Sequence, residues 1–150
     1  MIQRKQTIFL ILAIICSVIC LSLPLGTIEQ DEVVVGNFYN LWAVRDGVRS
    51  FITWPLFAIL LVTIPLAIVA IFAYNNRRFQ IHLCNLCMLL ILGWYIVTIV
   101  IPKSMLTDMH LSITYSYGAA LPFISMVMYF LAKRGVIADE KLIKSTEHFR

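Results

Sequence analysis

Four long apolar runs, separated by polar segments, dominate the hydropathy pattern of the chain. They cover residues 7–25, 52–74, 81–101 and 114–132, and none of them contains Asp, Glu, Lys or Arg. A helix rises about 1.5 Å per residue and the hydrocarbon core of a bilayer is about 30 Å thick, so about 20 apolar residues suffice to cross it. The pattern therefore predicts an all-α membrane protein in which residues 1–150 form a single domain, a bundle of four transmembrane helices.

The second and fourth runs contain Pro65 and Pro122. A proline inside a helix removes a backbone donor and usually kinks the helix. We therefore expect kinks in these two helices, either as structural features alone or as the frame of a cavity between them. The fourth run is the least hydrophobic at its start, where it contains Tyr115, Ser116, Tyr117 and Gly118.

Charged residues predict the orientation of the bundle. Nine of the twelve Lys and Arg residues flank the runs on one side, namely Arg4, Lys5, Arg77, Arg78, Lys133, Arg134, Lys141, Lys144 and Arg150. Arg45, Arg49 and Lys103 lie on the opposite side. Because cytoplasmic loops are enriched in Lys and Arg, we expect both termini and the tail 133–150 in the cytoplasm. We also expect the first run to be an uncleaved anchor rather than a signal peptide.

The connection 26–51 is the only sizeable polar segment expected outside the membrane. It contains two stretches of β-prone residues and the dipeptide Asp46-Gly47, which is a strong hairpin-turn signal. We expect these stretches to form a small antiparallel sheet between the first two helices. An irregular loop lying on the lipid headgroups is the alternative.

Composition supports the membrane assignment. Hydrophobic residues make up 61% of the chain and charged residues 13%, and the mean hydropathy is +0.88. A soluble domain typically has about 45–50% apolar and about 25% charged residues. The net charge of +4 is not gathered in a dense basic tract, so we expect no nucleic-acid partner.

Candidate chemistry is sparse in this sequence. Cys84 and Cys87 have the C-x-x-C spacing of thiol oxidoreductases, but the predicted orientation places them at the cytoplasmic end of the third helix. His82 lies nearby on a different face of that helix, so these residues do not form a metal site. Ion-coupled transport relies on ionisable groups within the spans, and the runs contain no acidic or basic residue apart from His82 near one end. We expect no catalytic residues, no metal and no cofactor.

Two groups of residues are candidates for contact with a partner or with lipid. The first is aromatic and lies in the connection 26–51: Phe38, Tyr39, Leu41 and Trp42. The second lies in the short turn between the second and third helices: Arg77, Arg78 and Gln80. These arginines either serve topology alone, because basic residues beside a span hold the loop inside, or their guanidinium groups also clamp a lipid phosphate, a partner carboxylate, or the acidic residues of the chain's own tail. We expect that tail to be helical and to lie along the membrane surface.

Residues 1–7, the turn 76–81 and the tail residues 139–142 resemble a bacterial family of short, four-span inner-membrane proteins classed as a domain of unknown function. The resemblance covers nearly the whole chain and implies a bacterial cytoplasmic membrane, without an activity or catalytic residues to carry over. The four-span plan with a large first outer loop is also similar to that of claudin-like proteins. Those proteins carry a Gly-Leu-Trp motif and a cysteine pair in that loop, whereas here only Leu41-Trp42 matches, so this likeness is one of architecture.

These patterns favour a non-enzymatic accessory or scaffold subunit that is embedded in the lipid bilayer and binds another membrane protein or a second copy of itself. One alternative is a small transporter or lipid-binding protein with a cavity between the second and fourth helices. A membrane thiol oxidoreductase is a less favoured alternative.

Overall fold

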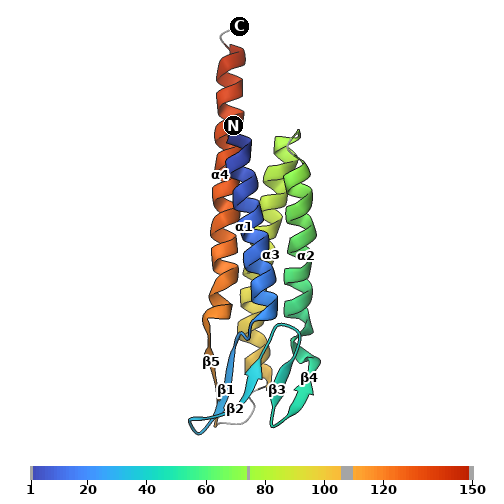
Figure 1. Cartoon of the computed structure of the whole chain (residues 1–150), viewed down its shortest axis with the longest axis vertical. Coiled ribbons are helices and arrows are strands. Elements are labelled where there is room, and N and C mark those ends of the chain that lie inside the picture. Colours follow the sequence, from blue (N-terminus) through green and yellow to red (C-terminus); the bar gives the residue numbers. More distant parts are fainter. Residues whose placement is uncertain (1, 74, 106–109, 149–150) are drawn as a thin grey trace.

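The computed structural model of the protein describes residues 2–73, 75–105 and 110–148. Its four helices form an antiparallel bundle (Figure 1) and are α1 (Ile2–Ser22), α2 (Trp54–Phe72), α3 (Arg77–Met105) and α4 (Leu121–His148). Each is long and apolar enough to cross a membrane, which confirms the four expected apolar helices. The ends of the predicted second span and of the tail, Tyr74 and Arg150, lie outside the described residues.

An antiparallel sheet covers one end of the bundle (Figure 1). Its strands are β1 (Gly26–Gln30), β2 (Val33–Phe38), β3 (Ala43–Arg45), β4 (Val48–Ser50) and β5 (Leu111–Tyr115), in the order β4-β3-β2-β1-β5. The first four strands come from the connection between α1 and α2, so the expected small sheet is confirmed. β5 was not expected, because it comes from the connection between α3 and α4, part of which the hydropathy pattern assigned to the fourth span.

Two hairpin turns shape the sheet. Asp46 and Gly47 join β3 to β4 with φ angles of 50° and 80°. Positive φ at both central residues is the requirement of the type I′ turn that closes a two-residue hairpin, so the predicted hairpin is confirmed. Asp31 and Glu32 join β1 to β2 with φ angles of 50° and 68°. This second turn was not predicted, because glutamate is uncommon at positive φ.

One face of the sheet packs on the half of α3 that lies nearest to it. Ile28 and Phe38 are buried in one cluster with Trp94 of α3. The hydroxyl of Tyr115 donates a hydrogen bond to the carbonyl of Thr98, with an O···O distance of 3.1 Å. Partial burial raises the pKa of Tyr115, so this hydroxyl keeps its proton at neutral pH. The sheet is therefore fixed to the bundle through its core side.

All four helices contribute to a second core inside the bundle. Each helix packs on two neighbours in a ring, so α2 and α4 lie on a diagonal. The hydroxyl of Ser125 in α4 donates to the carbonyl of Ala13 in α1 at 3.1 Å and thereby joins the two helices. The hydroxyl of Ser17 donates to the same carbonyl from within α1 at 3.0 Å. The buried members of this core are Leu10, Ala13, Ala67, Ala70, Leu83, Cys84, Cys87, Ile91, Tyr129 and Ala132.

The fourth helix differs from its prediction at both ends. It begins at Leu121 rather than Thr114, because β5 and a 3-10 turn, Tyr117–Ala120, precede it. Pro122 therefore lies in the first turn of α4, where its missing N–H has no intrahelical partner. The kink expected inside this span was wrong for that reason. Beyond the bundle, α4 continues without a break to His148 (Figure 1). The described part of the tail is thus a projecting extension of α4 and not a separate surface helix.

Replacing Tyr129 with Phe should stabilise the protein. The Tyr129 hydroxyl is buried near the side chains of Cys87 and Thr63 but forms no hydrogen bond of good geometry among the described residues. A buried hydroxyl without such a bond costs about 1–3 kcal/mol. We expect Tyr129→Phe to raise the melting temperature in mild detergent. Tyr95→Phe is the matched control, because it removes a hydrogen bond of 2.9 Å to the Ala119 carbonyl and should lower the melting temperature. A lower melting temperature for Tyr129→Phe would contradict this interpretation.

Candidate interaction sites at the two ends of the bundle

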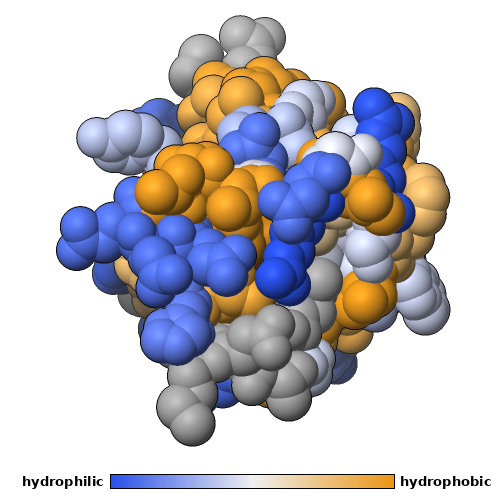
Figure 2. All heavy atoms as spheres, turned by 90° about the horizontal axis from the view of Figure 1, so that it is seen from below, coloured by the Kyte–Doolittle hydropathy of each residue, from blue (hydrophilic) through white to orange (hydrophobic). Residues whose placement is uncertain are grey.

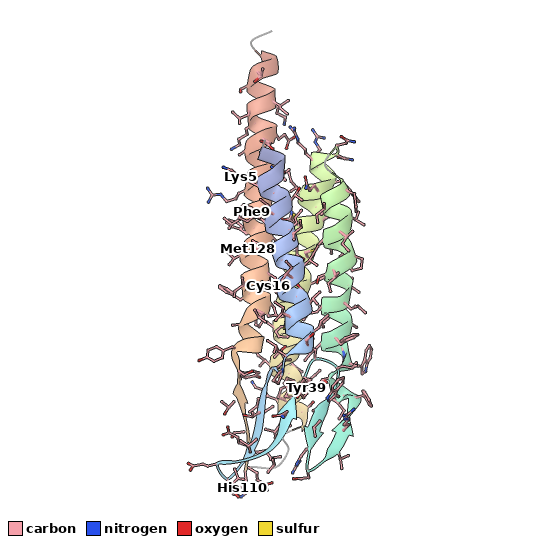
Figure 3. All side chains as sticks on the ribbon, in the orientation of Figure 1. Lys5, Phe9, Cys16, Tyr39, His110 and Met128 are labelled. Carbon is pink, nitrogen blue, oxygen red and sulfur yellow. The ribbon has the colours of Figure 1, made fainter. Side chains whose placement is uncertain are left out.

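The aromatic candidates lie at the junction of sheet and bundle, where Figure 3 labels Tyr39. Tyr39 and Trp42 are half-buried, and their ring centroids lie 5.4 Å apart at an interplanar angle of 38°. The guanidinium of Arg49 lies 5.5 Å from the centroid of the Trp42 ring, within the range of a cation–π interaction. We call Tyr39, Trp42 and Arg49 the aromatic–arginine cluster.

The other two aromatic-segment candidates have different places. Phe38 is 0% exposed and belongs to the core beneath the sheet, so it is not displayed on the surface, contrary to expectation. It is the last residue of β2, and its side chain points to the face of the sheet that covers α3. Leu41 is half-buried beside the cluster. The accessible part of the aromatic segment is therefore Tyr39, Leu41 and Trp42.

A buried asparagine holds this segment in place. The amide nitrogen of Asn40 donates to the carbonyl of Cys20 in α1, and its amide oxygen accepts from the indole nitrogen of Trp94 in α3, both at 2.9 Å. The thiol of Cys20 in turn donates to the carbonyl of Gly118 at 3.2 Å. Sequence analysis missed Asn40. The available signal was Trp94, since a tryptophan buried inside a bundle needs an acceptor for its N–H.

The sheet end also displays single apolar side chains. Figure 2 views the molecule from this end and shows hydrophobic residues among hydrophilic ones. Val33, Val34 and Val48 are exposed on the strands, and Tyr117, just after β5, is 93% exposed. Val48 is the neighbour of Arg49 on β4, whereas Val33 and Val34 lie on β2 and Tyr117 lies beyond the other edge strand, β5. The exposed apolar side chains are therefore spread over the sheet end and do not form one patch.

The basic candidates lie at the opposite end, which we call the tail end. Arg78 is brought to the tail of the chain itself, with its Nε 4.0 Å from a carboxylate oxygen of Glu140. The Lys144 ammonium lies 3.4 Å from the same oxygen. The Arg78 side chain is 81% exposed, so solvent screening limits this pair to at most about 1 kcal/mol. The expected partners of the arginines were a lipid phosphate, a partner carboxylate and the acidic tail. In the structure, Arg78 forms an ion pair with the acidic tail at Glu140.

A buried contact beneath that ion pair fixes α4 against α1. The amide nitrogen of Gln6 donates to the carboxylate of Asp139 at 2.9 Å, and both side chains are buried. Gly135 lies one turn earlier on α4, and a Cβ there would meet the Gln6 side chain at 3.1 Å. Gln80 is also buried at this end, while Arg77 is half-buried. Gln80 is therefore part of the packed interior and not part of an open clamp.

Three of the four cysteines are buried in this structure. Cys20, Cys84 and Cys87 are buried and Cys16 is half-buried, all as free thiols. The Cys87 thiol points to the carbonyl of Thr63 at 3.9 Å. Among the described residues, no group of three or more His, Cys, Asp or Glu side chains is placed to hold a metal ion.

Removing the Asn40 side chain should loosen the sheet from the bundle. Asn40→Ala leaves the Trp94 indole and the Cys20 carbonyl buried without this partner, at a cost of about 1–3 kcal/mol for each group. We expect a clearly lower melting temperature in detergent and faster proteolysis within residues 26–50. Asn37→Ala is the control, because Asn37 is exposed on the sheet. Equal stability of the two variants would show that the Asn40 bonds do not hold the sheet.

Comparison with known families adds one finding to this geometry. A family model described as "Domain of unknown function (DUF4293)" matches residues 2–149. None of the curated proteins compared with the chain matches it at a significant level. The family match includes both helix-bundle ends and the whole sheet, in agreement with the resemblance noted from the sequence. The chain therefore belongs to the family described as a domain of unknown function, DUF4293.

Proposed function

We propose that this protein is a non-enzymatic accessory or scaffold subunit of the bacterial cytoplasmic membrane that binds another membrane protein. The observation that carries the proposal is the aromatic–arginine cluster on a fixed sheet. Tyr39 and Trp42 flank the buried Asn40, whose two hydrogen bonds attach this segment to α1 and α3. Arg49 extends the cluster on β4.

Such a cluster has the composition and rigidity of a protein interface. Tyr, Trp and Arg are the residues most enriched among those that dominate binding energy. A surface that is already ordered loses little conformational entropy on binding, so more of the contact energy is available for affinity. Its place at the junction of sheet and helices suits a partner that also lies in the membrane. Direct contact of the same aromatics with lipid headgroups is the competing explanation.

The charge distribution supports an orientation with the sheet outside the cytoplasm. Lys5 lies at the end remote from the sheet, and His110 and Tyr39 lie at or near the sheet (Figure 3). The turn between α2 and α3, with Arg77 and Arg78, is at the same end as Lys5 (Figure 1). Under the positive-inside rule this end faces the cytoplasm.

A transport or lipid-binding cavity between α2 and α4 receives no support from the described residues. These helices lie on a diagonal, and the space between them contains the buried core with Tyr129 at 0% exposure. Pro65 is exposed on α2, whereas Pro122 is buried at the start of α4. The two prolines therefore do not frame a common space.

Cysteine labelling tests the orientation. Val48→Cys places a thiol on exposed β4, where the valine is 69% exposed, and Ser145→Cys places one on the exposed end of α4. With a membrane-impermeant maleimide, we expect Val48→Cys to react in intact spheroplasts and Ser145→Cys to react only after permeabilisation. The wild-type chain is the control for its own cysteines. The reverse pattern would overturn the orientation.

Alanine variants of the aromatic–arginine cluster test the function. After crosslinking and purification in mild detergent, we expect the wild-type chain to retain one reproducible membrane-protein partner. Trp42→Ala or Arg49→Ala should each reduce the affinity by about thirtyfold, which corresponds to a loss of about 2 kcal/mol. Phe72→Ala is the control, because Phe72 is 75% exposed at the opposite end of α2. A wild-type chain that is always a clean monomer would refute the proposal.

A further inference from the structure

The two free edges of the sheet differ in how they are protected. β4 is three residues long and carries Arg49, and short or charged edges resist pairing with other chains. β5 is five residues long, has the sequence LSITY and contains neither charge nor proline. The one β-bulge in the described sheet lies between β1 and β2, away from both edges. Among the described strands, none pairs with the outer side of β5.

The register of β5 determines which of its backbone groups are free. Hydrogen bonds run from Ser116 N to Leu25 O at 2.8 Å and from Asp31 N to His110 O at 3.4 Å, one at each end of the β1–β5 pair. In an antiparallel ladder, hydrogen-bonded pairs alternate with non-bonded pairs along the strand. The pairs Leu25–Ser116 and Asp31–His110 are hydrogen-bonded, so the alternation makes Thr27–Thr114 and Glu29–Ser112 the bonded pairs between them. Within β5, Ser112 and Thr114 are therefore the residues that bond to β1.

The N–H and C=O groups of Leu111, Ile113 and Tyr115 therefore point away from β1, along the free edge. They repeat every two residues, or about 7 Å. An extended main chain matches this repeat of alternating donors and acceptors, which is the basis of recognition by strand addition. The edge thus specifies an extended peptide segment as its ligand.

The side chains of β5 specify the pattern of that segment. Leu111 and Ile113 are partly buried against the core beneath the sheet, whereas Ser112 and Thr114 are exposed on the other face. A segment that continues the sheet therefore alternates apolar residues on the α3 side with polar residues on the outer side. Tyr117 lies two residues beyond the end of β5 and is 93% exposed, so an aromatic side chain is accessible near that end of the strand.

A second copy of the chain does not fit this edge within one membrane. The strands run roughly along the axis of the bundle (Figure 1). Two copies related by a two-fold axis along the membrane normal would bring their β5 edges together in parallel, with the apolar sides of the two sheets on opposite faces. The apolar side of the sheet would not continue across such a contact. This mismatch argues against a two-fold symmetric dimer at β5 and favours a segment of a different protein as the ligand.

We propose that the free edge of β5 binds an extended extracytoplasmic segment of the partner protein, which adds to the sheet as a sixth strand. This inference rests on the accessory function proposed above, and it adds the chemical nature of the partner's contact. The aromatic–arginine cluster lies at the opposite edge of the sheet, beside β4, so the two contacts can be removed separately.

A proline at position 113 tests the proposal, because the N–H of Ile113 points to the free edge and not to β1. Proline is tolerated on edge strands where its missing donor faces outward. We expect Ile113→Pro to retain the fold but to reduce capture of the wild-type partner, identified by mass spectrometry, at least tenfold. Ile113→Val is the control, because it keeps both the N–H and a β-branched side chain. Folding of each variant is checked by its melting temperature and its elution as a single species.

Thr114→Lys provides the same test but keeps every backbone N–H group of β5. The Thr114 side chain lies on the exposed face of the sheet, and lysine is a residue that natural edge strands use against strand addition. We expect Thr114→Lys also to reduce capture of the wild-type partner at least tenfold. In the wild-type complex, amide exchange should slow at Leu111, Ile113 and Tyr115 and stay unchanged at Ser112 and Thr114.

The outcomes separate this inference from the proposed function. If the folded Ile113→Pro and Thr114→Lys variants both keep the partner at the wild-type level, strand addition at β5 is wrong and the accessory function stands. If the wild-type chain retains no partner at all, both proposals are wrong. A second copy of this chain found on the β5 edge would overturn the assignment to a different protein.

Discussion

The buried amide of Asn40 joins the sheet to the helix bundle. In lipid, a helix satisfies its backbone groups internally, but the carbonyls of its last turn remain without partners. α1 ends at Ser22, and the carbonyl of Cys20 in that last turn is bonded by Asn40. The same side chain accepts the indole N–H of Trp94. One amide therefore satisfies the end of α1, orients a large aromatic side chain of α3, and positions the turn that follows β2.

The position of β5 follows from the same end of α1. The chain leaves α1 and enters β1 within four residues, and the thiol of Cys20 and the carbonyl of Leu25 both bond to the segment just after β5. A Cβ on Gly118 would come within 2.6 Å of the Pro24 carbonyl, so this approach requires glycine. β5 is thus attached to α1 and β1 before α4 begins, which explains why α4 starts later than hydropathy alone indicates.

The parts of the fold that sequence analysis predicted are those determined by local chemistry. Uncharged runs of sufficient length specify four helices that are long and apolar enough to cross a membrane, and Asp46-Gly47 specifies a hairpin by its backbone preferences. The parts it missed depend on contacts between distant segments. The residues of β5 suit a strand or the start of a span equally well, and pairing with β1 decides between them. The burial of Phe38 depends on which face of β2 covers α3. Within α4, buried Asp139 accepts a hydrogen bond from Gln6, which lies near the other end of the chain.

The spans themselves offer little basis for selecting a partner. Several of their polar side chains bond within the bundle, as Ser17 and Ser125 do at the carbonyl of Ala13. The side chains that face outward are mostly apolar, and lipid tails are as apolar as leucine, so contact between such helices depends on shape alone.

Directional recognition needs hydrogen bonds or charges, and these are found at the two ends of the bundle. At the tail end, Glu140 already engages Arg78 and Lys144. The sheet end instead presents main-chain donors and acceptors on β5 that no described residue uses. Under the proposed accessory function, selectivity for a partner would therefore be set by the sheet that Asn40 holds in place and not by the apolar outer faces of the helices.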